Sequence, residues 1–176
     1  MRIKIIGILT LLAIQFSYAQ QKNNEVETIS KLLFEPKSKE VLVIVHRGDW
    51  RNAPENSIRA IENTIKMGAD MVEIDIQKTK DGQLVLMHDK TLNRTTNGKG
   101  NVSDFTLEEI KKLYLKSGIG IETHHRIPTL EEAMLVAKGR IFVNIDKGLI
   151  LEGTGEFYAS FRLRAQNHAE ILVSKG

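Results

Sequence analysis

The clearest pattern along the chain is a series of short apolar runs with little polar alternation. Such runs are typical of strands that are buried on both faces, as in a parallel sheet. Four of them predict strands, at Val41–Val45, Met71–Ile76, Leu84–Met87 and Ile141–Ile145. A shorter run at Ile171–Val173 is compatible with a further strand.

Helical periodicity fills most of the segments between these strands. Ser57–Met67 places its isoleucines on one stripe, with Asn56 or Ser57 able to cap its start and Gly68 placed to end it. Thr106 and Thr129 each begin a capping-box spacing, which predicts a second and a third helix.

One connection is expected to lack a helix. Asp81-Gly82 is a tight-turn signal, so the second and third strands should be joined directly. Strands that otherwise alternate with helices predict an α/β fold with a mainly parallel sheet. In the last segment, Phe157–Ala165 is compatible with a helix.

The first residues have the order of a secretory signal peptide. Arg2 and Lys4 precede the apolar run Ile5–Ile14, and Ser17-Tyr18-Ala19 supplies small residues at a cleavage site before Gln20. The run is shorter than the ~20 residues of a membrane-spanning helix, although a retained N-terminal anchor is the alternative. The predicted division is a signal peptide at 1–19, a polar lead-in at 20–39 and one domain at 40–176. The protein is therefore expected to be exported, to a periplasm or the medium, without stable membrane insertion after cleavage.

Composition narrows the function classes. Cysteine is absent, which excludes disulfides, zinc thiolate sites and thiol catalysis. The formal net charge is +3 and the basic residues are scattered, so no nucleic-acid partner is expected. The chain has 176 residues, fewer than the roughly 250 of a complete (β/α)₈ barrel.

Ionisable side chains lie at or just after the ends of the four predicted strands, the edge where ligands bind in parallel α/β folds. They are His46 and Arg47, then Glu73 and Asp75, then His88 and Asp89, and finally Asp146. Glu73 and Asp75 are two positions apart on one strand and therefore share a face. Two adjacent carboxylates repel each other, and a divalent cation relieves that repulsion. The alternative is a carboxylate pair bonded to Arg or Lys inside the barrel.

Histidines and an arginine extend this candidate site. His46 and His88 are suited to a base-and-acid pair, because imidazole titrates near neutral pH. The alternative for either is a structural histidine. Arg47 offers a planar donor fork for a phosphate, or is an ion-paired arginine. His124 and His125 are expected in a polar loop and His168 lies in the last segment, and we interpret all three as surface residues.

The same residues carry a family resemblance. The chain resembles the glycerophosphodiester phosphodiesterases through six motifs in order: His46-Arg47-Gly48, Pro54-Glu55-Asn56-Ser57, Gly68-Ala69-Asp70 with Glu73-Ile74-Asp75, Thr79-Lys80-Asp81-Gly82, His88-Asp89, and Ile127-Pro128-Thr129-Leu130-Glu131-Glu132. The resemblance implies a TIM-type (β/α) barrel, of which this chain would carry the N-terminal half. It implies a metal-dependent phosphodiesterase whose substrate is a small-molecule glycerophosphodiester.

The resemblance also implies roles for individual residues. His46 and His88 would be the catalytic pair, with His46 as the base and His88 as the acid, and Arg47 would bind the phosphate. Glu73 and Asp75 would bind Mg²⁺ or Ca²⁺, and Asp146 would be the third ligand. Asp146 stands where the family usually has Glu, and Lys147 follows one residue earlier than the family's Lys.

Two other functions are compatible with this sequence. One is a related barrel phosphodiesterase that acts on intact phospholipids. The other is a truncated barrel fragment that is inactive or only binds a partner. The sequence leaves the metal, the alcohol and the oligomeric state open.

Overall fold

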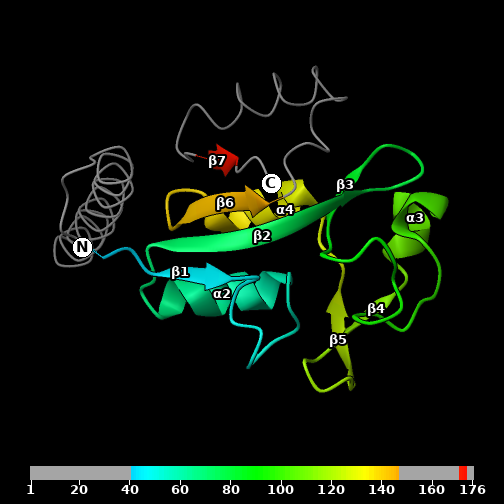
Figure 1. The fold of residues 1–176 in the computed structure, drawn as a ribbon, viewed down its shortest axis with the longest axis horizontal. Coiled ribbons are helices and arrows are strands. Elements are labelled where there is room, and N and C mark those ends of the chain that lie inside the picture. Colours follow the sequence, from blue (N-terminus) through cyan, green and yellow to red (C-terminus); the bar gives the residue numbers. More distant parts are fainter. Residues whose placement is uncertain (1–40, 147–170, 174–176) are drawn as a thin grey trace, which may run out of the picture.

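The computed structural model describes residues 41–146 and 171–173, and Figure 1 shows their arrangement. The predicted signal peptide at 1–19, the polar lead-in at 20–39, the possible helix at 157–165 and His168 lie outside these residues. They therefore remain predictions. Within the described residues no helix is long and apolar enough to cross a bilayer.

A parallel sheet forms the centre of the fold. Its strands follow the order β1 (Ile44–His46), β2 (Met71–Lys78), β6 (Phe142–Asp146) and β7 (Ile171–Val173), and each neighbouring pair is parallel. Strands joined in sequence order by crossovers are the geometry of a (β/α) barrel. The predicted α/β class and the short strand at Ile171–Val173 are confirmed.

Two helices cover one face of this sheet. These are α2 (Ile58–Lys66) and α4 (Leu130–Ala137), which lie together on the same side in Figure 1. Val72, Ile74 and Ile76 of β2 pack against them in one buried cluster with residues such as Ile61 and Met134. Because side chains alternate along a strand, the residues between these three point to the opposite face.

The helix starts follow the predicted capping. Ser57 caps α2 by accepting a hydrogen bond from the backbone of Ala60. Thr106 and Thr129 form complete capping boxes at the starts of α3 (Leu107–Ile110) and α4. Each capping box satisfies two backbone donors that the first helical turn would otherwise leave unpaired.

The first predicted strand is shorter and more exposed than the sequence indicates. β1 begins at Ile44 rather than Val41, and Val41 and Val43 are 83% and 54% exposed. Within the described residues β1 pairs with β2 alone. A strand with one neighbour leaves its other edge and part of its apolar surface uncovered.

The third predicted strand runs in the opposite direction to the others. β3 (Leu84–Leu86) pairs antiparallel with the end of β2, through the turn that Asp81-Gly82 predicts. The direct connection is confirmed, but a strand joined by a tight turn must reverse direction. Its carboxyl end therefore returns along β2, where the backbone N–H of Met87 donates to the carbonyl of Asp75 at 3.1 Å.

A small second layer follows β3. It contains the 3₁₀ turn η1 (Val102–Asp104), α3, and the hairpin of β4 (Tyr114–Lys116) and β5 (Glu122–Arg126) around its own apolar cluster. The sequence predicts a polar loop at His124 and His125, which is wrong, because both lie in β5. Its run Glu-Thr-His-His-Arg has no apolar alternation, and pairing with β4 makes it a strand. His124 is exposed and His125 is half-buried.

Candidate functional site

One face of β2 carries the centre of the site. Glu73, Asp75 and Gln77 alternate with the core residues and point away from the helices. Asp75 is 1% exposed and Glu73 is 8% exposed. Burying ionisable groups without compensation is costly, so their surroundings must provide charge or hydrogen bonds.

The third predicted carboxylate lies beside the first two. Asp146 on β6 is in register with Asp75, and Asn144 is in register with Glu73. Each of Glu73, Asp75 and Asp146 offers a carboxylate oxygen, and these three atoms lie within 4.8 Å of one another. Burial, together with the nearby charges of Asp75 and Asp146, raises the pKa of Glu73 above its usual value, although the backbone N–H of Arg47 opposes the shift.

The donor set fits a hard divalent cation. Three carboxylates from two adjacent strands lie close together, and carboxylate oxygens are ligands that Mg²⁺ and Ca²⁺ prefer. The side-chain oxygen of Asn144 is buried and has no hydrogen-bond partner within the described residues. A buried oxygen without a donor is unusual, and a nearby cation is one of the partners that would satisfy it.

Arg47 joins both acidic residues of β2. Its backbone N–H donates to Glu73 Oε2 at 2.9 Å, and its Nε lies 3.3 Å from Asp75 Oδ2. Its Nη1 donates to Glu55 Oε1 at 3.1 Å. The ion-paired alternative for Arg47, and for Asp75, is therefore seen. Arg47 Nη2 donates no hydrogen bond to any described residue.

This contact requires an unusual backbone conformation. Arg47 has a φ of 56°, a left-handed conformation that costs a non-glycine residue about 1 kcal/mol or more. The following Gly48 has a φ of 72°, and a Cβ there would lie 2.8 Å from the Cβ of Ala60. The chain after β1 therefore turns tightly against α2, and only a glycine fits the second position.

Asn56 holds Asp75 in place. Its Nδ2 donates to Asp75 Oδ2 at 2.9 Å, and its Oδ1 accepts from the backbone N–H of Asp75 at 3.0 Å. Both residues are buried. The bond to Oδ2 orients the carboxylate, and the bond from the backbone N–H fixes the Asn56 amide beside it.

His46 stands at the open end of the group. It is in register with Glu73 across β1 and β2, and its Nε2 lies 3.9 Å from Glu73 Oε2. Its side chain is 63% exposed. An exposed imidazole beside a buried acidic cluster is accessible both to solvent and to a ligand at that cluster.

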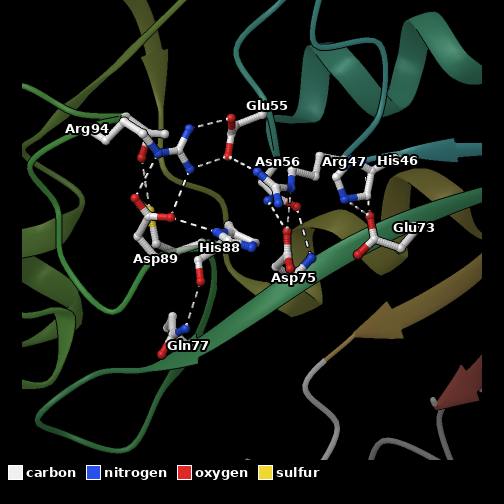
Figure 2. Close-up of polar contacts among 12 residues, drawn as sticks. His46, Arg47, Glu55, Asn56, Glu73, Asp75, Gln77, His88, Asp89 and Arg94 are labelled. Carbon is white, nitrogen blue, oxygen red and sulfur yellow. Dashed lines mark hydrogen bonds and ion pairs between the residues drawn. The ribbon is translucent and has the colours of Figure 1, made fainter. Parts of the chain in front are cut away.

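His88 reaches the same face by a different route. The sequence places it at the end of a parallel strand, whereas the antiparallel β3 carries it back toward the middle of β2. Gln77 Nε2 donates to its carbonyl at 3.1 Å, and Asp89 Oδ1 lies 2.6 Å from its Nδ1. In Figure 2 these side chains gather over β2, with His46 and Glu73 at one end and Asp89 at the other.

Comparison with known proteins decides the family. The profile of the glycerophosphoryl diester phosphodiesterase family matches residues 46–147, more than half of the chain. The chain belongs to this family. The matched segment includes every predicted site residue from His46 to Asp146.

Relatives within the family support the assignment. The chain is 51% identical over 114 residues to a glycerophosphodiester phosphodiesterase of Caldanaerobacter subterraneus, an alignment that covers 62% of this chain and 47% of that protein. It is 45% identical over 97 residues to glycerophosphodiester phosphodiesterase 1 of mouse, covering 53% of this chain and 29% of that protein. The chain therefore spans less than half of the length of these relatives.

Solved structures of the family share the fold. A glycerophosphoryl diester phosphodiesterase from Parabacteroides distasonis superposes with a TM-score of 0.70 at 37% identity, covering 83% of this chain and 51% of that one. A phosphodiesterase of Oleispira antarctica, solved with the product sn-glycerol 3-phosphate, superposes with a TM-score of 0.60 at 29% identity. That match covers 76% of this chain and 56% of the other. The prediction of a partial TIM-type barrel is confirmed.

The predicted site residues are close together, but the sequence predicts no specific role in the site for the residues that hold them. These supporting residues are Glu55, Asn56, Gln77, Asp89 and Arg94. Glu55, Asn56 and Asp89 fall inside family motifs, which was a usable signal. Gln77 continues the alternation of Glu73 and Asp75, so its face was predictable. Arg94 lies in a polar loop without any sequence signal.

Proposed function

We propose that this site hydrolyses glycerophosphodiesters to glycerol 3-phosphate and an alcohol, with the help of a divalent cation. The observation that carries the proposal is the meeting of three carboxylates, Arg47 and two histidines on one sheet edge. Family membership supports the substrate class. The bound product of the Oleispira antarctica phosphodiesterase supports glycerol 3-phosphate as the product.

The carboxylates would hold the cation. Glu73, Asp75 and Asp146 are the ligands we propose, and Asn56 keeps Asp75 oriented toward them. When bound, Mg²⁺ or Ca²⁺ supplies positive charge that polarises a phosphoryl oxygen. Arg47 would supply a second positive charge to the phosphate.

The two histidines would move the protons. His46, exposed beside Glu73, takes the proton from the nucleophile, which is water or the hydroxyl group next to the phosphate in the substrate. Attack by water gives glycerol 3-phosphate directly. Attack by the hydroxyl group gives a cyclic phosphodiester as the alkoxide leaves, and water then opens this ring to glycerol 3-phosphate. His88 gives a proton from Nε2 to the leaving alkoxide. The Asp89 carboxylate is hydrogen-bonded to the other ring nitrogen of His88, Nδ1.

A parallel assay of two substrates tests the substrate class. Purified protein with saturating Mg²⁺ or Ca²⁺ is given glycerophosphocholine in one reaction and phosphatidylcholine vesicles in the other. We expect release of choline from glycerophosphocholine and none from the vesicles. Preferential hydrolysis of phosphatidylcholine would instead identify a barrel phosphodiesterase that acts on phospholipids.

We also propose that the protein is exported. The support is the charged, apolar and small-residue order of residues 1–19. N-terminal sequencing of protein from the periplasm or medium is expected to begin at Gln20. Soluble cytosolic protein that retains Met1 would contradict export.

A further inference from the structure

A continuous chain of ion pairs connects Arg47 to His88 across the site (Figure 2). Glu55 Oε1 accepts from Arg47 Nη1 at 3.1 Å, and the same carboxylate accepts from Arg94 Nη1 at 2.8 Å and Nη2 at 2.9 Å. Arg94 also donates to Asp89 through Nε at 2.8 Å and Nη2 at 2.9 Å. Asp89 Oδ1 then lies 2.6 Å from His88 Nδ1.

Charges alternate in sign along this chain. Burial opposes ionisation of Glu55, but the hydrogen bonds and charges of Arg94 and Arg47 outweigh it and lower its pKa. The hydrogen bonds to Arg94 hold the pKa of Asp89 well below its usual value, with His88 contributing less. Hydrogen bonds to Glu55 and Asp89 raise the pKa of Arg94. Both carboxylates are therefore ionised at neutral pH and Arg94 is charged.

The position of Arg94, at the centre of this series of ion pairs, suits arginine better than lysine. All three of its nitrogens are engaged, and it bonds both carboxylates through paired contacts. A planar guanidinium matches this fork geometry, whereas the ammonium of lysine is a single point of charge. The Arg94 side chain is 49% exposed, whereas the side chains of Glu55 and Asp89 are 17% and 26% exposed. Paired contacts from one guanidinium hold both carboxylates in a defined orientation.

The series of ion pairs from Arg47 to His88 joins two parts of the fold that are separated in sequence. Glu55 lies between β1 and α2, and Arg94 follows β3, 39 residues later. Arg47 belongs to the first part and His88 to the second. The Glu55–Arg94 pair is thus a direct polar link between the residue proposed to bind phosphate and the proposed acid.

We propose that Glu55 and Arg94 are positioning residues that set Arg47 and His88 relative to each other. Arg94 fixes the Asp89 carboxylate, which fixes the His88 ring, while Glu55 fixes both guanidinium groups. This inference rests on the proposed function, because it concerns residues that act through Arg47 and His88.

The arrangement determines which nitrogen of His88 is active. An ionised carboxylate only accepts hydrogen bonds, so Nδ1 of His88 must carry the proton that faces Asp89. Nε2 is then the nitrogen that exchanges a proton with the substrate. If Arg94 no longer holds Asp89, the neutral ring is free to place its proton on Nε2 instead.

Nitrogen-15 NMR of the histidine rings, on the full chain in EDTA, tests this inference without requiring turnover. The spectra are recorded at a pH where the rings are neutral, for wild type, Arg94→Lys, Glu55→Gln and the control Arg59→Lys. Arg59 is matched to Arg94 in exposure, at 47%, and pairs with Glu62 on α2. We expect His88 to be protonated on Nδ1 in wild type and in the control, and to lose that single tautomer in Arg94→Lys.

Glu55→Gln keeps the size of the side chain, so it tests the series of ion pairs even if the Arg94→Lys variant folds poorly. Its His88 signal is expected to change in the same direction. In an active preparation both variants should lower kcat on the order of 10²-fold, the usual consequence of misplacing a reacting group by about 1 Å. A His88 ring that stays protonated on Nδ1 in both folded variants would overturn the inference. An inactive wild type would count against the proposed function alone.

Discussion

Replacing Glu73 with glutamine is expected to weaken the binding of Mg²⁺ or Ca²⁺ at least about 100-fold, since even residues outside the ligand shell change metal affinity by about 10- to 100-fold. The substitution keeps the shape of the side chain but removes the charge from a group of three carboxylates within 4.8 Å. Isothermal titration of each ion into the purified protein measures the effect.

A surface substitution supplies the control for this titration. Glu108 lies on α3, where its exposed carboxylate pairs with Lys112. Glu108→Gln removes the same charge from the protein and should leave the affinity unchanged. If Glu73→Gln and Asp75→Asn both bind the ion as tightly as wild type, the assignment of the cation site is wrong.

Replacing His88 with alanine is expected to separate catalysis from cation binding. Turnover of glycerophosphocholine should fall about 10²- to 10⁴-fold, the range for loss of a general acid or base. The affinity for the ion should hardly change, because the three proposed ligands lie on β2 and β6 and His88 follows β3. Initial rates and titrations on the same preparations give both quantities.

His124→Ala is the matched control for His88→Ala. His124 is exposed on β5, so its removal deletes an imidazole outside the site, and full activity is expected. A His88 variant that retains full turnover would exclude His88 as the acid. One that loses the ion as well would show that His88 supports the cation site.

The parallel strands were predictable because strands buried in a sheet have a recognisable pattern of apolar residues. β2 alternates core residues such as Val72 and Ile74 with Glu73 and Asp75, and this alternation correctly predicted which residues face the helices. The length and exposure of β1 were harder to predict, because an apolar run does not indicate how many neighbouring strands will pair with it. The exposure of Ile44, the first residue of β1, is consistent with pairing to β2 alone within the described residues.

The sequence also contains a signal for the direction of β3. A tight turn at Asp81-Gly82 joins only antiparallel strands, so the reversal was implied once the helix was excluded. The hairpin of β4 and β5 had no comparable signal. Its polar residues become a strand only through pairing across the hairpin, which is a tertiary effect.

In the site too, contacts set by local spacing were predictable from the sequence, and contacts between distant segments were not. Spacing of two residues predicted that Glu73 and Asp75 share a face, and register then placed Asp146 opposite Asp75. The contact between Glu55 and Arg94 spans 39 residues and depends on how two loops meet. Composition and periodicity do not predict such a pair.

Phosphorus-31 NMR of glycerophosphocholine with the purified chain tests the central claim most directly. The claim predicts that the diester signal is replaced by that of glycerol 3-phosphate, that EDTA stops the conversion, and that added Mg²⁺ or Ca²⁺ restores it. A diester signal that persists with either ion present would contradict the claim and would favour an inactive or binding-only barrel fragment. Conversion at an undiminished rate in EDTA would contradict the role given to Glu73, Asp75 and Asp146.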